Sequence, residues 1–150
     1  MHEIFMLAAL KQSRKALPEC LPNPPVGCVI VDAQNIVSQG YTHAPGKYHA
    51  EADALLHIEL QAFDYLKMYV TLEPCSFDGR TPSCALAIAK YPQIHEIYVS
   101  IIDPDPRNNG QGLDILRKAG KIVHVGLCAN EVGDFLHQYL FTPGQQAEPN

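Results

Sequence analysis

The sequence lacks any apolar run long enough to span a bilayer, and its N-terminus shows no cleavable signal pattern. Internal repeats and low-complexity tracts are also missing. These absences predict a cytoplasmic protein without a membrane partner.

Basic charge is scarce as well. The chain has 11 lysines and arginines against 16 aspartates and glutamates, a formal net charge of −5. Because binding to nucleic acid depends on cationic side chains that neutralise phosphates, this balance disfavours nucleic acid as a partner. This charge balance does not exclude a local basic patch.

Cysteines are few and odd in number, five in 150 residues. An odd count in a reducing compartment argues against a disulfide framework. Cys28 and Cys128 lie in or directly after apolar runs, so we expect both to be small core residues. The residues around Cys20 indicate no role for this cysteine.

What the chain does have is an alternation of strand and helix patterns within one domain-sized sequence. A sheet covered by helices, an α/β fold, follows from this alternation. We expect a domain over 1–141 and a disordered polar tail over 142–150. Predicted helices are 2–17, 49–63, 82–90, 113–119 and 130–141, and predicted strands are 26–32, 36–41, 67–72, 95–102 and 121–127.

Three short segments together fit one zinc site: His49-Ala-Glu51, Pro74-Cys75 and Cys84. One imidazole and two thiolates give zinc three protein ligands and leave its fourth position to water. His49 and Glu51 are two residues apart, so they converge on one point only where a helix begins. Pro82 likewise places Cys84 near a helix start, and helix N-termini favour ionised thiols.

Each segment alone has an ordinary explanation, because His-Ala-Glu and Pro-Cys occur on many surfaces that bind no metal. Their combination predicts hydrolytic deamination. Zinc lowers the pKa of a bound water, and Glu51 would carry its proton to the substrate ring and then to the leaving amine.

Longer motifs extend this pattern along the chain. Residues 22–31 read PNPPVGCVIV, residues 69–75 read YVTLEPC, and residues 79–84 read GRTPSC. A DPDP segment at 103–106 is followed by a Gly-x-Gly at 110–112. With His49-Ala-Glu51, these segments resemble the deaminase domain of the bifunctional riboflavin-biosynthesis enzymes, within the cytidine-deaminase-like superfamily.

The resemblance implies a three-layer α-β-α fold with a mixed sheet of about five strands, a small-molecule aminopyrimidine substrate and assembly as a homo-oligomer. It implies that the diaminopyrimidinone ribose phosphate of riboflavin synthesis is deaminated with a Zn2+ cofactor. It assigns Glu51 as the catalytic acid and base and His49, Cys75 and Cys84 as zinc ligands. The substrate-binding residues that it implies are Asn23, His43, Arg80, Thr81 and Asp103. For Asn23, a purely structural role in the proline-rich loop is an equal alternative.

Two positions depart from the family pattern: Phe77 replaces a usual histidine, and Ser83 replaces a usual proline. Phe77 keeps open a paralogue that deaminates another aminopyrimidine, nucleoside or purine-like base. A zinc-stabilised binding module without catalysis is a third possibility, against which Glu51 argues. RNA editing is disfavoured by the acidic charge and by the eight residues between Cys75 and Cys84. The sequence ends where the family's reductase domain would begin, so we expect a stand-alone or excised deaminase domain.

Overall fold

A computed structural model of the chain describes residues 1–141, so the tail predicted to be disordered at 142–150 lies outside the described residues. A five-stranded mixed sheet forms its centre, in the order β2-β1-β3-β4-β5. β1 is antiparallel to β2 and β3, whereas β3, β4 and β5 are parallel. The strands are β1 Gly27–Asp32, β2 Asn35–Tyr41, β3 Leu66–Leu72, β4 Ile94–Ile101 and β5 Ile122–Val125.

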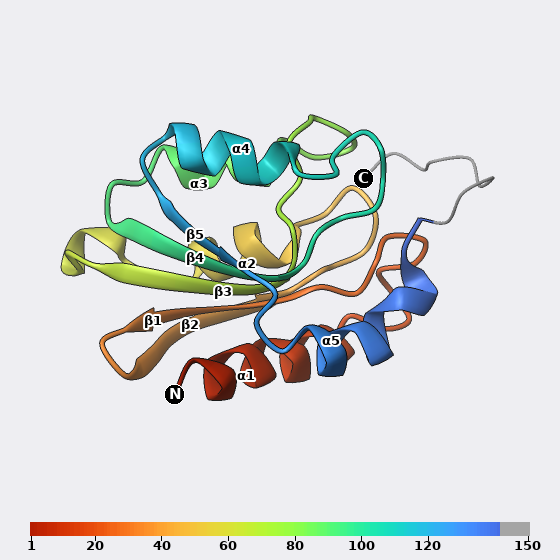
Figure 1. Cartoon of the computed structure of the whole chain (residues 1–150), viewed down its shortest axis with the longest axis horizontal. Coiled ribbons are helices and arrows are strands. Elements are labelled where there is room, and N and C mark those ends of the chain that lie inside the picture. Colours follow the sequence, from red (N-terminus) through yellow and green to blue (C-terminus); the bar gives the residue numbers. More distant parts are fainter. Residues whose placement is uncertain (142–150) are drawn as a thin grey trace.

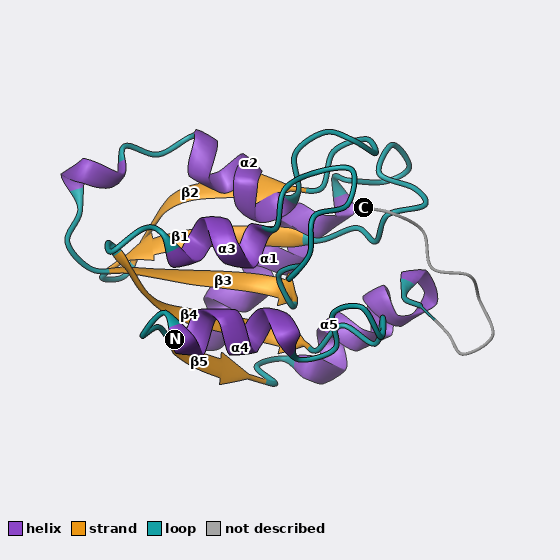
Figure 2. Cartoon of the chain, turned by 90° about the horizontal axis from the view of Figure 1, so that it is seen from above, coloured by secondary structure: helices purple, strands orange, loops and turns teal. Residues whose placement is uncertain are grey.

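Helices cover both faces of this sheet: α1 and α5 lie on one face, and α2, α3 and α4 lie on the other (Figure 1, Figure 2). This arrangement confirms the predicted three-layer α-β-α fold. Within residues 1–141, no helix is long and apolar enough to cross a membrane. The helices are α1 His2–Arg14, α2 Ala50–Leu56, α3 Cys84–Ala89, α4 Gln111–Lys118 and α5 Ala129–Leu136, with short 3-10 helices at η1 Leu60–Ala62 and η2 His137–Tyr139.

The hydrophobic core lies on both sides of β1, β3 and β4, which explains why these strands are apolar on both faces. Met6 of α1 and Leu116 of α4 are fully buried from opposite layers. Each such side chain stabilises the fold by about 1.5–3 kcal/mol. Cys28 is fully buried in this core, as the sequence predicts, whereas Cys128 is only partly buried and packs against the core from outside.

The helix predicted over 49–63 is shorter in the structure, and it presents a different face to the core. α2 ends at Leu56, and the imidazole Nδ1 of His57 lies 2.8 Å from the carbonyl oxygen of Asp53. The His57 amide donates to the Ala54 carbonyl and not to that of Asp53, so the helix ends in a tighter turn. Within α2, Leu56 is 57% exposed, although its apolar side chain in the predicted helix favours the core, and Ala54 is buried.

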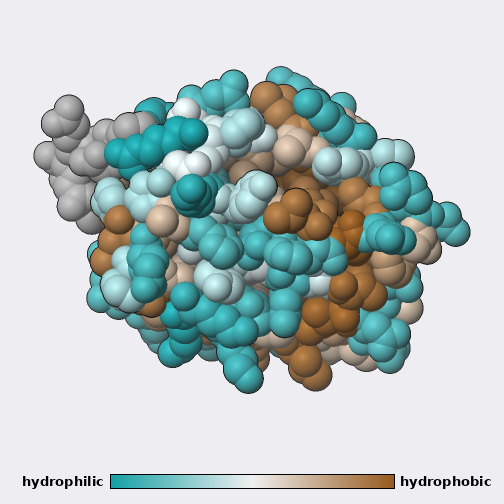
Figure 3. All heavy atoms as spheres, turned by 180° about the vertical axis from the view of Figure 1, so that it is seen from behind, coloured by the Kyte–Doolittle hydropathy of each residue, from teal (hydrophilic) through white to brown (hydrophobic). Residues whose placement is uncertain are grey.

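On the back of the molecule, apolar side chains gather on one side, while hydrophilic ones cover most of the rest (Figure 3).

Three other helix starts differ from prediction by one or two residues. Pro82 lies outside α3, because Ser83 is its N-cap and accepts a hydrogen bond from the amide of Leu86. α4 begins at Gln111 and not at 113, and α5 begins at Ala129 and not at 130. The serine that replaces the usual family proline therefore has a structural role at the start of α3.

The parallel strands β3 and β4 end side by side, with Leu72 opposite Ile101 in the register. The amide of Glu73 donates to the carbonyl of Ile101 at 2.9 Å, so the pairing continues just past β3. Ligand sites in sheets of this kind lie outside the carboxyl ends of the strands. Cys75 follows β3 and Asp103 follows β4, so both reach the same edge of the sheet.

Candidate active site and metal centre

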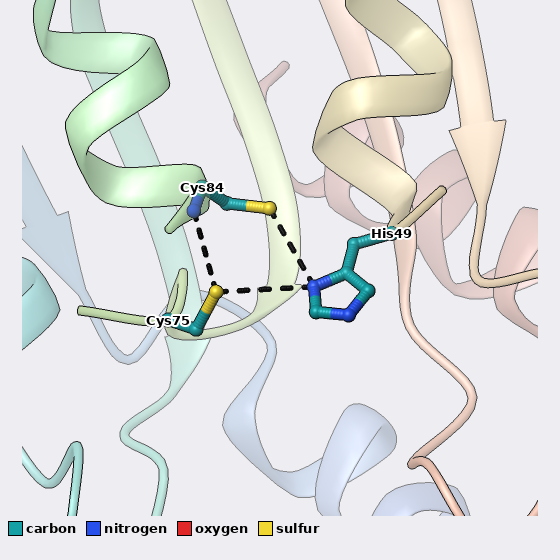
Figure 4. A group of neighbouring side chains, drawn as sticks. All are labelled: His49, Cys75 and Cys84. Atoms are coloured by element: carbon teal, nitrogen blue, oxygen red, sulfur yellow. Dashed lines mark hydrogen bonds between the residues drawn. The ribbon is translucent and has the colours of Figure 1, made fainter. Parts of the chain in front are cut away.

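His49, Cys75 and Cys84 meet at this edge, although each comes from a different part of the chain (Figure 4). His49 is the N-cap of α2, Cys84 is the first residue of α3, and Cys75 lies in the loop after β3. Both helix starts therefore adjoin the cluster, as the spacing of His49 and Glu51 predicts. Within the described part of the chain, these three residues are the one group of histidine, cysteine or acidic side chains close enough to share an ion.

The distances within the cluster fit a tetrahedral zinc site. His49 Nδ1 lies 3.8 Å from Cys75 Sγ and 3.6 Å from Cys84 Sγ. Zinc bonded at about 2.3 Å to sulfur and about 2.0 Å to nitrogen separates these two kinds of ligand by about 3.6 Å. The two sulfurs and the nitrogen also lie within 4.8 Å of one another. Two thiols and one imidazole are ligands that zinc prefers, so the residues present fit this ion.

The backbone around Cys75 and Cys84 holds the two sulfurs together. The Cys84 amide donates to Cys75 Sγ at 3.3 Å, and the Ser83 hydroxyl donates to the Cys75 carbonyl at 2.8 Å. A hydrogen bond from the Cys84 thiol, together with His49 and the Cys84 amide, lowers the pKa of Cys75 to about 5. The same thiol contact and burial raise the pKa of Cys84. Cys75 therefore ionises first.

The two ring nitrogens of His49 have different neighbours. Nδ1 faces the sulfurs, whereas Nε2 lies 3.0 Å from the hydroxyl oxygen of Thr81. Burial lowers the pKa of His49, but the contact with Cys75 and the charge of Glu51 outweigh it, so the net shift is upward. The imidazole is thus held at both nitrogens.

Glu51 lies in the first turn of α2, two residues after His49, and is 4% exposed. Burial, with the nearby Cys75 sulfur, raises the pKa of its carboxyl to about 7. A carboxyl with a pKa near neutral pH can both accept and donate a proton, which is what an acid and base catalyst requires. Glu51 also lines two cavities that meet at the cluster.

The first of these, which we call the small cavity, has a volume of about 50 Å³. Asn23 and Asp103, two of the predicted substrate-binding residues, both line it with Glu51. Burial raises the pKa of Asp103 to about 6. The remaining lining residues are Pro24, Val26, Thr42, His49, Leu72, Glu73 and Cys75.

The second, which we call the large cavity, has a volume of about 560 Å³ and lies between the starts of α2 and α3. Arg80 and Thr81, also predicted to bind substrate, line this cavity. Lys47, which the sequence analysis did not single out, brings a second positive charge to it. Apolar side chains of α2 and α3, including Leu55 and Ala87, form another part of the wall.

His43 is the predicted site residue that the structure does not bring to either cavity. Its Nε2 lies 3.0 Å from a carboxylate oxygen of Asp53, and its ring stacks on Tyr41 with centroids 4.7 Å apart. Asp53 is buried, and the Tyr41 amide also donates to it. His43 therefore helps to join β2 to α2, and a contact with substrate stays a prediction.

Glu73 is a residue of the site that the sequence analysis missed. Its carboxylate is buried and accepts hydrogen bonds from the amides of Asp103, Gly110 and Leu113 at 2.9–3.1 Å. Three such bonds tie the segment that carries Asp103 to the segment that carries Cys75. A signal was present in the sequence, because a charged residue directly after a buried apolar strand requires partners.

Asn108 and Gly112 complete this frame. The Asn108 amide donates to the Pro74 carbonyl and to Asp103, and its oxygen accepts from the Ser76 amide. At Gly112, a Cβ atom would lie 2.0 Å from the Pro74 carbonyl oxygen, so only glycine permits this approach. No sequence signal distinguishes Asn108 from an ordinary turn residue.

Phe77 does not line the small or the large cavity. Its ring packs under the guanidinium of Arg107, which lies 4.6 Å from the ring centroid. Arg107 also forms an ion pair with Asp105 at 2.6 Å. Phe77 therefore joins two loops beside the cavities, and its effect on the choice of substrate stays a prediction.

Comparison with known proteins gives one family model, described as the cytidine and deoxycytidylate deaminase zinc-binding region, which matches residues 1–101. A diaminohydroxyphosphoribosylamino-pyrimidine deaminase of Buchnera aphidicola is 41% identical over 132 residues, covering 87% of this chain and 88% of that protein. The riboflavin biosynthesis protein RibD of Aquifex aeolicus is 40% identical over 148 residues. These residues are 97% of this chain but 40% of RibD, so the chain spans about two fifths of that relative.

Solved structures agree with this result. RibD of Acinetobacter baumannii matches with a TM-score of 0.84 and 38% identity, over 91% of this chain and 37% of that chain. A deaminase and reductase of Thermotoga maritima matches with a TM-score of 0.83 and 32% identity, over 92% of this chain and 40% of that chain. The resemblance therefore holds in three dimensions as well as in sequence.

Proposed function

The chain belongs to the cytidine and deoxycytidylate deaminase zinc-binding family, and on this basis we propose that it is a zinc-dependent pyrimidine deaminase of riboflavin biosynthesis. Its substrate would be the diaminopyrimidinone ribose phosphate, which loses one exocyclic amine as ammonia. The domain that carries this activity would be residues 1–141.

The observation that carries the proposal is the position of Glu51. A buried carboxylate with a pKa near 7 lies beside three residues that fit zinc and faces both cavities. A site that serves only to stabilise the fold has no need of such a group. This argues against a binding module without catalysis.

His49, Cys75 and Cys84 would hold the ion, and bound zinc supplies an activated water as nucleophile. Glu51 would take one proton from that water and give it to a ring nitrogen as the oxygen adds to the carbon that bears the amine. Glu51 would then take the second proton from the added hydroxyl and donate it to the departing nitrogen, which leaves the carbonyl on the ring. The products are the ring carbonyl compound and ammonia.

The two cavities suggest how the substrate is divided between them. Asn23 offers both a donor and an acceptor in the small cavity, which suits the edge of a pyrimidinone ring. Arg80 and Lys47 line the large cavity, which suits a phosphate. We therefore propose that the reacting edge of the ring enters the small cavity, while the ribose phosphate occupies the large one.

A paralogue that deaminates another base is the second candidate. Phe77 is the residue that favours it, although its ring packs against Arg107 and lines neither the small nor the large cavity. The basic side chains of the large cavity favour a phosphorylated substrate instead.

An ammonia-release assay with zinc-loaded protein distinguishes these functions. The panel contains the phosphorylated pyrimidinone, its dephosphorylated form, cytidine, cytosine and guanine. We expect turnover of the phosphorylated pyrimidinone and much weaker turnover of the dephosphorylated form. Turnover of free bases alone would overturn the proposal in favour of the paralogue. A protein that binds zinc and turns over no compound would instead support the binding module.

Cytoplasmic location and assembly as a homo-oligomer stay predictions. Light scattering coupled to size-exclusion chromatography measures the mass of the assembly directly, for comparison with 16.6 kDa for one chain.

A further inference from the structure

We propose that Thr81 is a positioning residue for the metal site, whose hydroxyl holds the His49 imidazole in the tautomer that presents a free Nδ1 to the ion. The inference rests on the zinc site of the proposed function but not on the identity of the substrate. It gives Thr81 a role distinct from the substrate contact that the family resemblance implies.

The first step of the argument is the chemistry of a neutral imidazole. It carries one ring hydrogen, and only the nitrogen without that hydrogen can bind a metal. Of the two His49 nitrogens, Nδ1 faces Cys75 and Cys84, so the hydrogen must be on Nε2 for zinc to bind. A hydrogen on Nδ1 would point at the two sulfurs and exclude the ion.

The second step is the neighbour of Nε2. Thr81 Oγ1 lies 3.0 Å from it, a normal length for an N–H···O hydrogen bond. With the hydrogen on Nε2, the imidazole donates and the threonine oxygen accepts. Histidine ligands in metal sites almost always donate their other nitrogen to such a partner, which fixes the ring and its tautomer. Thr81 supplies that partner here.

The third step is that the loop holds Thr81 in place. The Gly79 amide donates to the Thr81 carbonyl at 3.0 Å, and the Ser83 amide donates to Asp78 at 2.8 Å. Ser83 in turn donates to the carbonyl of Cys75. The segment that carries Thr81 is therefore tied to a zinc ligand, so the hydroxyl and the sulfurs keep a fixed relation around the imidazole.

The test compares Thr81→Val, which removes the hydroxyl at nearly constant volume, with Thr81→Ser, which retains it. Zinc affinity is measured by competition with a chromophoric chelator at fixed pH. Loss of such a partner typically weakens metal binding by about 10–100-fold, so we expect a loss of this size in Thr81→Val and recovery in Thr81→Ser. Ser76→Ala is the matched control, because Ser76 adjoins Cys75 but its hydroxyl bonds to the Arg107 carbonyl.

Nitrogen-15 NMR of the His49 ring gives a second readout. In the zinc-loaded parent we expect the hydrogen on Nε2 with the chemical shift of a hydrogen-bonded N–H, and in Thr81→Val the shift of an N–H without that partner. Circular dichroism of each variant checks that it folds. Thr81→Val with parental zinc affinity and an unchanged Nε2 shift would overturn the inference and leave the proposed deaminase intact. A parent protein that binds zinc but releases no ammonia would contradict the deaminase and leave the inference intact.

Discussion

The small and large cavities share His49 and Glu51 but differ in how their polar groups are held. In the small cavity, the Glu73 carboxylate is held by three backbone amides, and Asp103 accepts from the Asp105 amide and from Asn108. In the large cavity, Arg80 is exposed, and apolar helix side chains form much of the wall. A rigid polar wall suits recognition of a ring, whereas an exposed cation suits attraction of a phosphate. The rate of catalysis and the stability of the fold should therefore depend on the small cavity, and substrate affinity should depend on the large one.

Substitution of Glu51, which lines both cavities, should have the largest effect on activity. Glu51→Gln keeps the shape of the side chain but cannot carry a proton, so ammonia release should fall by about 10²–10⁴-fold. Zinc content, measured by elemental analysis, should stay at the parental value. Glu59→Gln makes the same change at an exposed position and should have no effect. An active Glu51→Gln enzyme would remove the basis for treating the two cavities as one active site.

A change in the large cavity should affect substrate affinity alone. Arg80→Ala removes a charged hydrogen-bond donor, so KM for the phosphorylated substrate should rise by about 10–100-fold with little change in kcat. Steady-state kinetics on the phosphorylated and dephosphorylated compounds measure this directly. Arg117→Ala, at an exposed site on α4, is the control. An equal rise in KM for both compounds would contradict a phosphate contact at Arg80.

Loss of the hydrogen bonds that hold the wall of the small cavity should lower the stability of the fold. Glu73→Gln places an NH2 group where backbone amides donate, so the free energy of unfolding should fall by about 1–3 kcal/mol. Urea unfolding of the metal-free protein is the measurement, and Arg80→Ala should leave the same curve unchanged. Parental stability in Glu73→Gln would mean that the two cavities do not differ in rigidity.

Much of this site could be predicted because its reactive residues are strong signals in sequence. The ligand types of His49, Cys75 and Cys84 limit the metal, and the spacing of His49 and Glu51 requires a helix start, which α2 provides. The alternating pattern similarly gave a sheet covered by helices. These features depend on local chemistry and on periodicity.

Contacts between loops could not be predicted in the same way. The bond between Thr81 and His49 joins residues 32 positions apart, and its existence depends on how α2 and α3 are placed on the sheet. His43 lies one residue from Thr42, which lines the small cavity, yet its own ring turns to Asp53. The end of α2 could not be predicted either, because no proline or glycine marks it between 57 and 63, and the His57 amide turns to the Ala54 carbonyl.

Gly112 has a consequence for any attempt to redesign this enzyme. Because the first turn of α4 touches the Pro74 carbonyl, the depth to which that helix settles on the sheet determines where Cys75 stands. Alanine at this position would push the turn apart from the loop that carries Cys75. A residue with no functional group thus sets how closely α4 approaches the loop of a candidate metal ligand.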